Sequence, residues 1–299
     1  DITDDGKIDY SLTNKVPKEL QQAIKDGKKI LVLINPPYAE AANSKGNSGK
    51  TDVAKTKAAE GMMDLGYAAR ELFVQFLIRV QKEIPTATIA MFSTLKYINA
   101  PNFEKFRAFW KAKYLNGFIV HSKAFDGIDG NFPIGFLVWN TAIKDEISLV
   151  DVVVFNKIAE PVGEKRFFSV PNKRMLSGWI ERIKTNTTTI PLKNAVHPQM
   201  GKAKVSSWSD TAIGYLLSNS NDVQNAGTLT AIFSSVYSAG NGYYITRGNF
   251  WKAAVVFSVR RLIKKTWLND RDQFLQPEIP LSDEFKNDCL IWMLFNGSN

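Results

Sequence analysis

The sequence predicts an α/β fold in which a mostly parallel sheet carries helices on both faces, followed by a mixed region that contains helices. In the first half of the chain, short apolar runs typical of buried strands alternate with longer segments of helical periodicity. Beyond about residue 158 the pattern changes, and residues 185–248 are irregular and rich in Thr, Ser, Asn and Gly. We therefore expect two regions, 1–158 and 159–299.

Alternating helix and strand patterns define the elements expected in region 1–158. A helix at 18–25 precedes a strand at 30–34, which must end at two prolines. A long helix is expected at about 52–83. Its apolar face would carry four large side chains, Leu65, Leu72, Phe76 and Val80. The other elements expected here are strands at 86–92, 117–120, 133–138 and 149–155 and a helix at 102–113.

Region 159–299 is expected to be mixed and to contain helices. Residues 166–170 can form a strand, and a helix at 172–184 would place apolar side chains on one face. Those side chains are Met175, Leu176, Trp179, Ile180 and Ile183. Asn249 fits the N-cap of a helix that runs to about residue 267, and a last helix at 283–295 would stop before Gly297.

Composition narrows the class of protein. At 299 residues and 44% hydrophobic content the chain can bury a large core, and its longest apolar runs are far shorter than the roughly 20 residues that span a bilayer. The single cysteine, Cys289, cannot form an internal disulfide and suggests a reduced, cytoplasmic setting. With two histidines and one cysteine, we expect no zinc-ligand cluster.

The chain is basic, and the excess is larger in its second region. The net charge is +9, with 21 basic and 18 acidic residues up to residue 158 and 17 and 11 after it. A basic balance suits a polyanionic partner such as DNA without establishing one.

The most informative motif is Asn35-Pro36-Pro37-Tyr38, which directly follows the apolar run 31–34. Proline lacks the N–H that a strand ladder needs, so the motif should lie at the carboxyl end of a strand. In open parallel sheets that edge is where ligands bind.

The residue types of this motif suit an exocyclic amine. The Asn35 side-chain oxygen and the Pro36 carbonyl can each accept a hydrogen bond from a planar NH2 group, which orients its nitrogen and stabilises the positive charge that develops on methyl transfer. Tyr38 can stack on the ring that carries the amine. The alternative is a strand-ending turn with a surface tyrosine.

Over roughly residues 28–140 the sequence resembles the N6-adenine DNA methyltransferases of bacterial restriction-modification systems, in particular the large fused type II enzymes. The resemblance rests on the order of three segments. These are Asn35-Pro36-Pro37-Tyr38, the strand at 86–92 with Ser93-Thr94-Leu95-Lys96-Tyr97, and the stretch from Ala124 to Phe136 that occupies the place of the family's second base-contacting aromatic. It implies a partial Rossmann-like, class I methyltransferase sheet.

The resemblance also implies a function. DNA would be bound, a target adenine flipped out of the duplex, and a methyl group moved to its N6 from S-adenosylmethionine. Asn35 and the Pro36 carbonyl would hold N6, with Pro37 completing the motif, while Tyr38 stacks on one face of the base. Phe132 would support the other face, with Phe125 as a rival. An equally good reading makes Phe132 a core aromatic at a strand start.

The chain departs from this family where the cofactor should bind. The family holds S-adenosylmethionine mainly in a Gly-rich strand-to-helix turn before the motif strand, and the 34 residues before Asn35 contain no such unit. We therefore expect this chain to lack most of the cofactor site, to be a fragment inactive alone, and to belong to a parent enzyme in which a nuclease can be fused or associated.

Six basic residues are candidate DNA contacts. Lys45 and Lys50 lie in a loop of small polar residues after the motif, where they could touch phosphates. Four others, Arg260, Arg261, Lys264 and Lys265, would form a stripe on the helix that begins after Asn249, for which a solvated surface is the competing interpretation.

Two other functions remain open. The same motif occurs in methyltransferases that act on protein glutamine or on RNA, although the long basic continuation favours DNA. The chain could also be a non-catalytic DNA-binding fragment that keeps the motif without the cofactor site.

Overall fold

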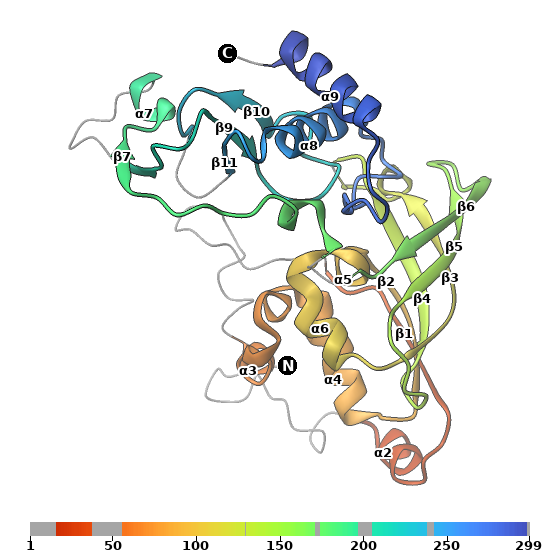
Figure 1. The fold of residues 1–299 in the computed structure, drawn as a ribbon. Coiled ribbons are helices and arrows are strands. Elements are labelled where there is room, and N and C mark those ends of the chain that lie inside the picture. The colour runs from red at the N-terminus through yellow and green to blue at the C-terminus, as the bar shows by residue number, and fades with distance from the viewer. Residues whose placement is uncertain are drawn as a thin grey trace. The chain divides into compact units, whose positions relative to one another are not determined.

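A computed structural model describes residues 16–37, 56–128, 130–170, 174–196, 205–237 and 242–297 (Figure 1). The chain divides into two compact units, Asp1–Val170 and Pro171–Asn299. The division falls after residue 170 rather than near 158, because the last strand before it pairs with the sheet of unit 1.

Unit 1 is built on a six-stranded sheet of order β1-β2-β4-β3-β5-β6. The strands are β1 (Ile30–Ile34), β2 (Ala87–Thr94), β3 (Lys113–His121), β4 (Pro133–Asn140), β5 (Leu149–Phe155) and β6 (Pro161–Phe168). β1 pairs parallel with β2 and β3 with β5, whereas the other three neighbouring pairs are antiparallel. Four strands therefore share one direction, and β4 and β6 run against them.

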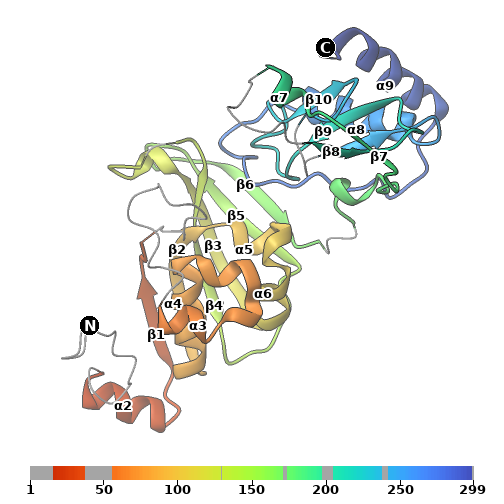
Figure 2. The ribbon, with the colours of Figure 1, turned by 90° about the vertical axis from the view of Figure 1, so that its left-hand side faces the viewer.

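The helical segments of unit 1 are α2 (Lys18–Lys25), α3 (Lys57–Glu60), η2 (Met63–Arg70), α4 (Leu72–Glu83), α5 (Lys96–Asn99), η3 (Pro101–Phe103), α6 (Glu104–Phe109) and η4 (Ser122–Ala124). Of these, α3, α4 and α6 lie on one face of the sheet, as the two views in Figures 1 and 2 show, whereas α2 buries no residue. The segments from α4 to α6 contribute to a buried aromatic core made of Phe73, Tyr97, Phe103, Phe106, Trp110 and Trp139.

The expectation of helices on both faces is wrong for the described part of the chain. On the face of the sheet opposite α3, α4 and α6, Leu31 and Leu33 alternate with half-buried residues along β1 and are 68% and 69% exposed. Val153 of β5 is exposed on the same face. A partly buried phenylalanine cluster, Phe92, Phe118, Phe125, Phe136 and Phe155, packs between these positions with ring centroids 4.7–6.1 Å apart.

The long helix expected at 52–83 is broken into three pieces, because Gly66 adopts a left-handed φ of 64° inside η2 and Glu71 is extended. The buried face is also not the expected one. Phe76 is exposed, and α4 instead buries Phe73, Val74 and Leu77. The helix expected at 102–113 is shorter as well, because Lys113 already belongs to β3.

Unit 2 combines a small antiparallel sheet with two long helices. The sheet order is β10-β9-β11, and β7 pairs with β8 in a separate two-stranded ribbon. Its elements are η6 (Leu176–Gly178), β7 (Thr187–Thr189), α7 (Leu192–Val196), β8 (Ser206–Trp208), β9 (Gly214–Ser218), β10 (Thr230–Phe233), β11 (Tyr243–Ile245), α8 (Phe250–Leu262) and α9 (Asp283–Asn296). Region 185–248 is therefore more regular than its composition suggested.

Two helices expected in unit 2 differ from the structure. The described residues 174–184 form no continuous helix, because the backbone there bonds to a distant segment: Leu176 N donates to the Phe274 carbonyl, and Gln276 N to that of Arg174. The helix α8 ends at Leu262 rather than near residue 267. The chain turns after it, because the Asn269 side chain forms hydrogen bonds with the backbone of residues 264 and 266.

Among the described residues, no helix has the length and apolar character needed to cross a bilayer.

Candidate active site

The site predicted from the sequence lies at what we call the carboxyl rim, the edge of the unit 1 sheet where β1, β2, β3 and β5 end. Ile34, the last residue of β1, pairs with Met91, whereas β2 continues to Thr94. Thr94 is level with Ile134 near the start of β4, and Ile134 with Val120 near the end of β3. The position after β1 is therefore set back from the end of its neighbour β2, and we call this step between the two strand ends the recess.

Asn35 and the two prolines occupy this recess. Pro36 is buried, and Asn35 and Pro37 are exposed. A buried Pro36 fixes the turn that leaves the strand, since its ring restricts both its own φ and the conformation of Asn35. The expected position of the motif at the carboxyl end of a parallel strand is thus confirmed, while Tyr38 lies outside the described residues.

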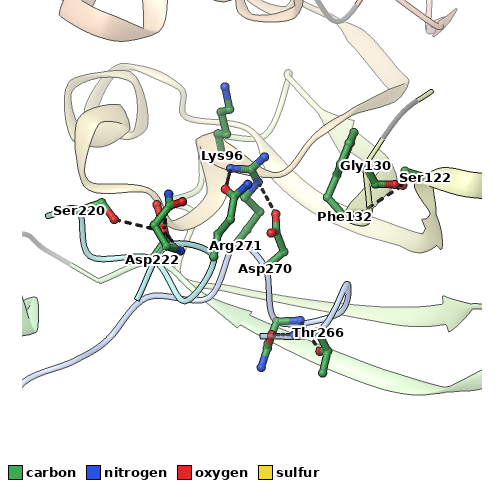
Figure 3. A network of polar contacts seen from close by, with 12 residues as sticks. Lys96, Ser122, Gly130, Phe132, Ser220, Asp222, Thr266, Asp270 and Arg271 are labelled. Carbon is green, nitrogen blue, oxygen red and sulfur yellow. Dashed lines mark hydrogen bonds and ion pairs between the residues drawn. The ribbon is translucent and has the colours of Figure 1, made fainter. Parts of the chain in front are cut away.

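Phe132 also lies at the carboxyl rim, immediately before β4, and its backbone is held by Ser122. The buried Ser122 hydroxyl donates to the Gly130 carbonyl at 2.9 Å and accepts from Phe132 N at 3.3 Å, and Ser122 N donates to the Phe132 carbonyl at 3.0 Å (Figure 3). Gly130 has a φ of 105°, and a Cβ built there would meet the Phe132 ring at 3.2 Å. The half-buried ring therefore rests over a glycine that leaves room for it.

Phe125, the rival to Phe132, is engaged elsewhere. Its ring packs edge-on against Phe92 with centroids 5.5 Å apart, and Phe92 contacts Phe136 at 4.7 Å. Phe125 thus belongs to the phenylalanine cluster, and the choice between Phe125 and Phe132 as the second base-contacting aromatic stays open.

A buried ion pair stabilises the rim behind the end of β2. Lys96 Nζ lies 2.7 Å from Glu71 Oε1, with 20% and 4% of the two side chains exposed. Glu71 precedes α4, and Lys96 is the first residue of α5, which follows β2. The pair therefore joins the start of α4 to the segment that follows β2. Sequence reasoning missed both this pair and Ser122, since a Glu and a Lys 25 residues apart carry no local signal.

The basic stripe expected on the helix after Asn249 is not formed. Arg260 is 1% exposed, and its guanidinium donates to Thr230 Oγ1 at 2.8 Å and to the carbonyls of Ser220 and Asn219 at 3.0 and 2.9 Å. Arg260 as a DNA contact is therefore wrong: it cross-links the inside of unit 2.

The other basic residues predicted to contact DNA are exposed or lie outside the described residues. Arg261 is exposed but donates to the Thr230 carbonyl at 3.1 Å, and Lys264 and Lys265 are exposed in the loop after α8. Lys45 and Lys50 lie outside the described residues.

An open cavity of about 450 Å³ is lined by residues of β3, β5 and β6, among them Asn116, Asp151 and Arg166. These residues lie along the strands, and a bidentate Asp151–Arg166 pair at 2.6 and 2.8 Å engages two of the four charged residues that line the cavity. Within the described part of the chain, no group of three or more His, Cys, Asp or Glu residues could hold a metal ion.

No protein-family model and no curated protein matches the sequence. A structure described as a cryoEM DrdV–DNA complex shares 14% identity over 52% of this chain and 17% of that chain, with a TM-score of 0.29. A structure described as the ATP-dependent Type ISP restriction-modification enzyme LlaBIII bound to DNA shares 10% identity over 74% of this chain and 16% of that one, with a TM-score of 0.32. Likeness at these scores carries no argument about function.

Proposed function

We propose that this chain carries the base-holding part of a DNA adenine-N6 methyltransferase from a restriction-modification system. The observation that carries the proposal is the position of Asn35 and Pro36 at the end of β1, in the recess beside the longer parallel strand β2. This is the position from which side-chain and backbone oxygens can bind a planar ligand placed over the rim. The DNA-bound neighbours are compatible with DNA as the partner, but the proposal does not rest on them.

The chain's own residues would orient the amine. Asn35 Oδ1 and the Pro36 carbonyl accept the two N6 hydrogens, so that the nitrogen lone pair points away from the base plane, and they stabilise the positive charge that develops on N6. Phe132 contacts one face of the base, and Tyr38 stacks on the other. Because N6 is paired inside the duplex, the adenine must be flipped out to reach this recess.

S-adenosylmethionine would supply the electrophilic methyl group. The 34 residues before Asn35 contain no Gly-rich strand-to-helix turn of the kind that holds this cofactor in the methyltransferases that the sequence resembles. We therefore expect other residues to hold it and the 299-residue chain alone to transfer no methyl group. Calorimetry with S-adenosylmethionine tests this point, because tight binding by the chain alone would contradict it.

The proposal is tested by Asn35→Ala in the full-length parent protein. Removing the amide oxygen should abolish methyl transfer to DNA and leave DNA binding largely unchanged, as measured with labelled S-adenosylmethionine and by fluorescence anisotropy. The matched control is Asn140→Ala at the opposite end of the sheet, where Asn140 only accepts a turn hydrogen bond from Ala142 N. Transfer by Asn35→Ala near the wild-type rate would refute the assignment.

A non-catalytic DNA-binding role is the second candidate, and the lack of a Gly-rich strand-to-helix turn in the 34 residues before Asn35 favours it. Wild-type protein that binds DNA but neither binds S-adenosylmethionine nor transfers a methyl group would support this role over catalysis.

A further inference from the structure

The two edge strands of the unit 1 sheet, β1 and β6, differ in how they are protected against pairing with a further strand. β6 begins at Pro161 and carries Gly163 at a φ of 144°, and the three residues that follow this glycine are charged. Proline, charged side chains and an irregular backbone are features that keep an edge strand from pairing further. β1 has none of them, because all five of its residues are aliphatic.

The outer side of β1 is open to a partner as far as the described residues show. Among them, β1 pairs with β2 alone, and Figure 2 shows it at one end of the sheet. Leu31 and Leu33 are mostly exposed on one face, and Ile30, Val32 and Ile34 on the other face are only half-buried. The backbone N–H and C=O groups along such an edge can pair with another strand.

The sequence of β1 reads the same in both directions, Ile-Leu-Val-Leu-Ile over Ile30–Ile34. A contact between two identical copies related by a twofold axis must be self-complementary. If two β1 strands pair antiparallel about Val32, Leu31 of one copy faces Leu33 of the second copy, and each end isoleucine faces an isoleucine. Every cross-strand pair then joins side chains of the same kind, and the exposed leucines of the two copies cover one another.

The charges that flank β1 favour the same direction of pairing. Lys28 and Lys29 precede the strand and are exposed, whereas the residues that follow it, 35–37, are uncharged. Antiparallel pairing sets the lysines of each copy beside the uncharged end of the other strand. Parallel pairing would set the lysines of the two copies opposite each other, and like charges in that position destabilise a strand pair.

We propose that β1 is a self-association surface, through which two copies of this chain join their sheets by antiparallel pairing of Ile30–Ile34 about Val32. The backbones supply the inter-strand hydrogen bonds, and Leu31 and Leu33 supply the apolar surface that is buried. A contact of five residues from each copy is small, so the dimer dissociates on dilution. Association of this kind does not depend on the proposed methyl transfer.

Charge patterns at Leu31 and Leu33 test the pairing, because these positions face each other in the two copies. Sedimentation velocity of the whole 299-residue chain over a dilution series gives the dimer dissociation constant. Leu31→Lys with Leu33→Lys opposes two ammonium groups twice and should raise this constant at least about tenfold. Leu31→Lys with Leu33→Glu opposes an ammonium and a carboxylate twice and should bind at least about tenfold more tightly than the first variant.

The control is Val162→Lys, an equally open position on the other edge strand, β6, which should leave the dissociation constant unchanged. Circular dichroism checks the folding of each variant. Val32→Cys gives an independent readout, because it places two thiols opposite each other and should form a disulfide-linked dimer on mild oxidation. The wild-type chain, whose one cysteine, Cys289, is buried, gives the background of this cross-linking.

Weaker association with two lysines, recovery with lysine and glutamate, and an unchanged control would together support the surface. A wild-type chain that is monomeric at every concentration would overturn it, and so would a variant with two lysines that associates as the wild type does. Equal loss of association in both double variants would overturn the antiparallel pairing, and an equal loss in Val162→Lys would place the contact outside β1.

Discussion

At the scale of single residues, the sequence located the motif correctly and missed what supports it. Two consecutive prolines after an apolar run leave little conformational choice, so the strand had to end at Asn35. Ser122 and Glu71 carry no such signal, because their partners Gly130 and Lys96 are brought to them only by the folded sheet. Arg260 was misjudged for the same reason, since periodicity does not show which basic side chain turns inward.

The buried ion pair behind the recess gives the first residue-scale prediction. Lys96→Met should lower the free energy of unfolding by about 3–5 kcal/mol, because it removes the ammonium group that lies 2.7 Å from the buried Glu71 carboxylate. Urea denaturation measures the loss, and a second variant, Lys96→Met with Glu71→Leu, should recover a large part of it. Arg166→Gln is the control, because its pair with Asp151 is exposed and should contribute little. An unchanged unfolding midpoint for Lys96→Met would show that the pair does not stabilise the rim.

Arg260 gives the second prediction at the scale of single residues. Arg260→Met removes three hydrogen bonds to unit 2 and leaves two carbonyls without their donor, so stability should fall by about 3 kcal/mol. Lys265→Met, an exposed neighbour in sequence, should change stability little. A variant at Arg260 that keeps wild-type stability but loses DNA affinity would restore the original interpretation of this residue as a DNA contact.

At the scale of helices and strands, the sequence prediction agrees with the structure where interactions between residues close in sequence determine the element. The helix at 18–25 and the strands at 30–34 and 149–155 have the bounds that periodicity predicts. The helix expected at 172–184 fails because its backbone donors and acceptors find partners about 100 residues away, which no local pattern can show. Met175, Leu176 and Ile180 are nevertheless buried, so the apolar pattern identified the core without identifying the backbone that presents it.

Strand β1 gives the element-scale prediction. It is the edge of the sheet, and Leu31 and Leu33 face solvent, which favours pairing with another chain. The double variant Leu31→Thr, Leu33→Thr should reduce self-association in light scattering and change the free energy of unfolding by less than about 1 kcal/mol. A loss of several kcal/mol would mean that these leucines are packed in the folded protein.

At the scale of the whole molecule, the sequence anticipated two regions and an α/β sheet, and it overestimated how symmetrically helices cover that sheet. Helix periodicity cannot state which face a helix covers, so the second face with Leu31, Leu33 and the phenylalanine cluster could not be foreseen. The basic excess did not locate a DNA surface either.

The central claim is that Asn35 and Pro36 hold the N6 amine of adenine. Mass spectrometry of nucleosides from DNA incubated with the full-length parent protein and S-adenosylmethionine tests it without knowledge of the recognition sequence. We predict N6-methyladenine with the wild-type protein and none with Asn35→Ala. Methylated cytosine alone, methylated protein glutamine or RNA in place of DNA, or N6-methyladenine formed equally well by Asn35→Ala would contradict the claim.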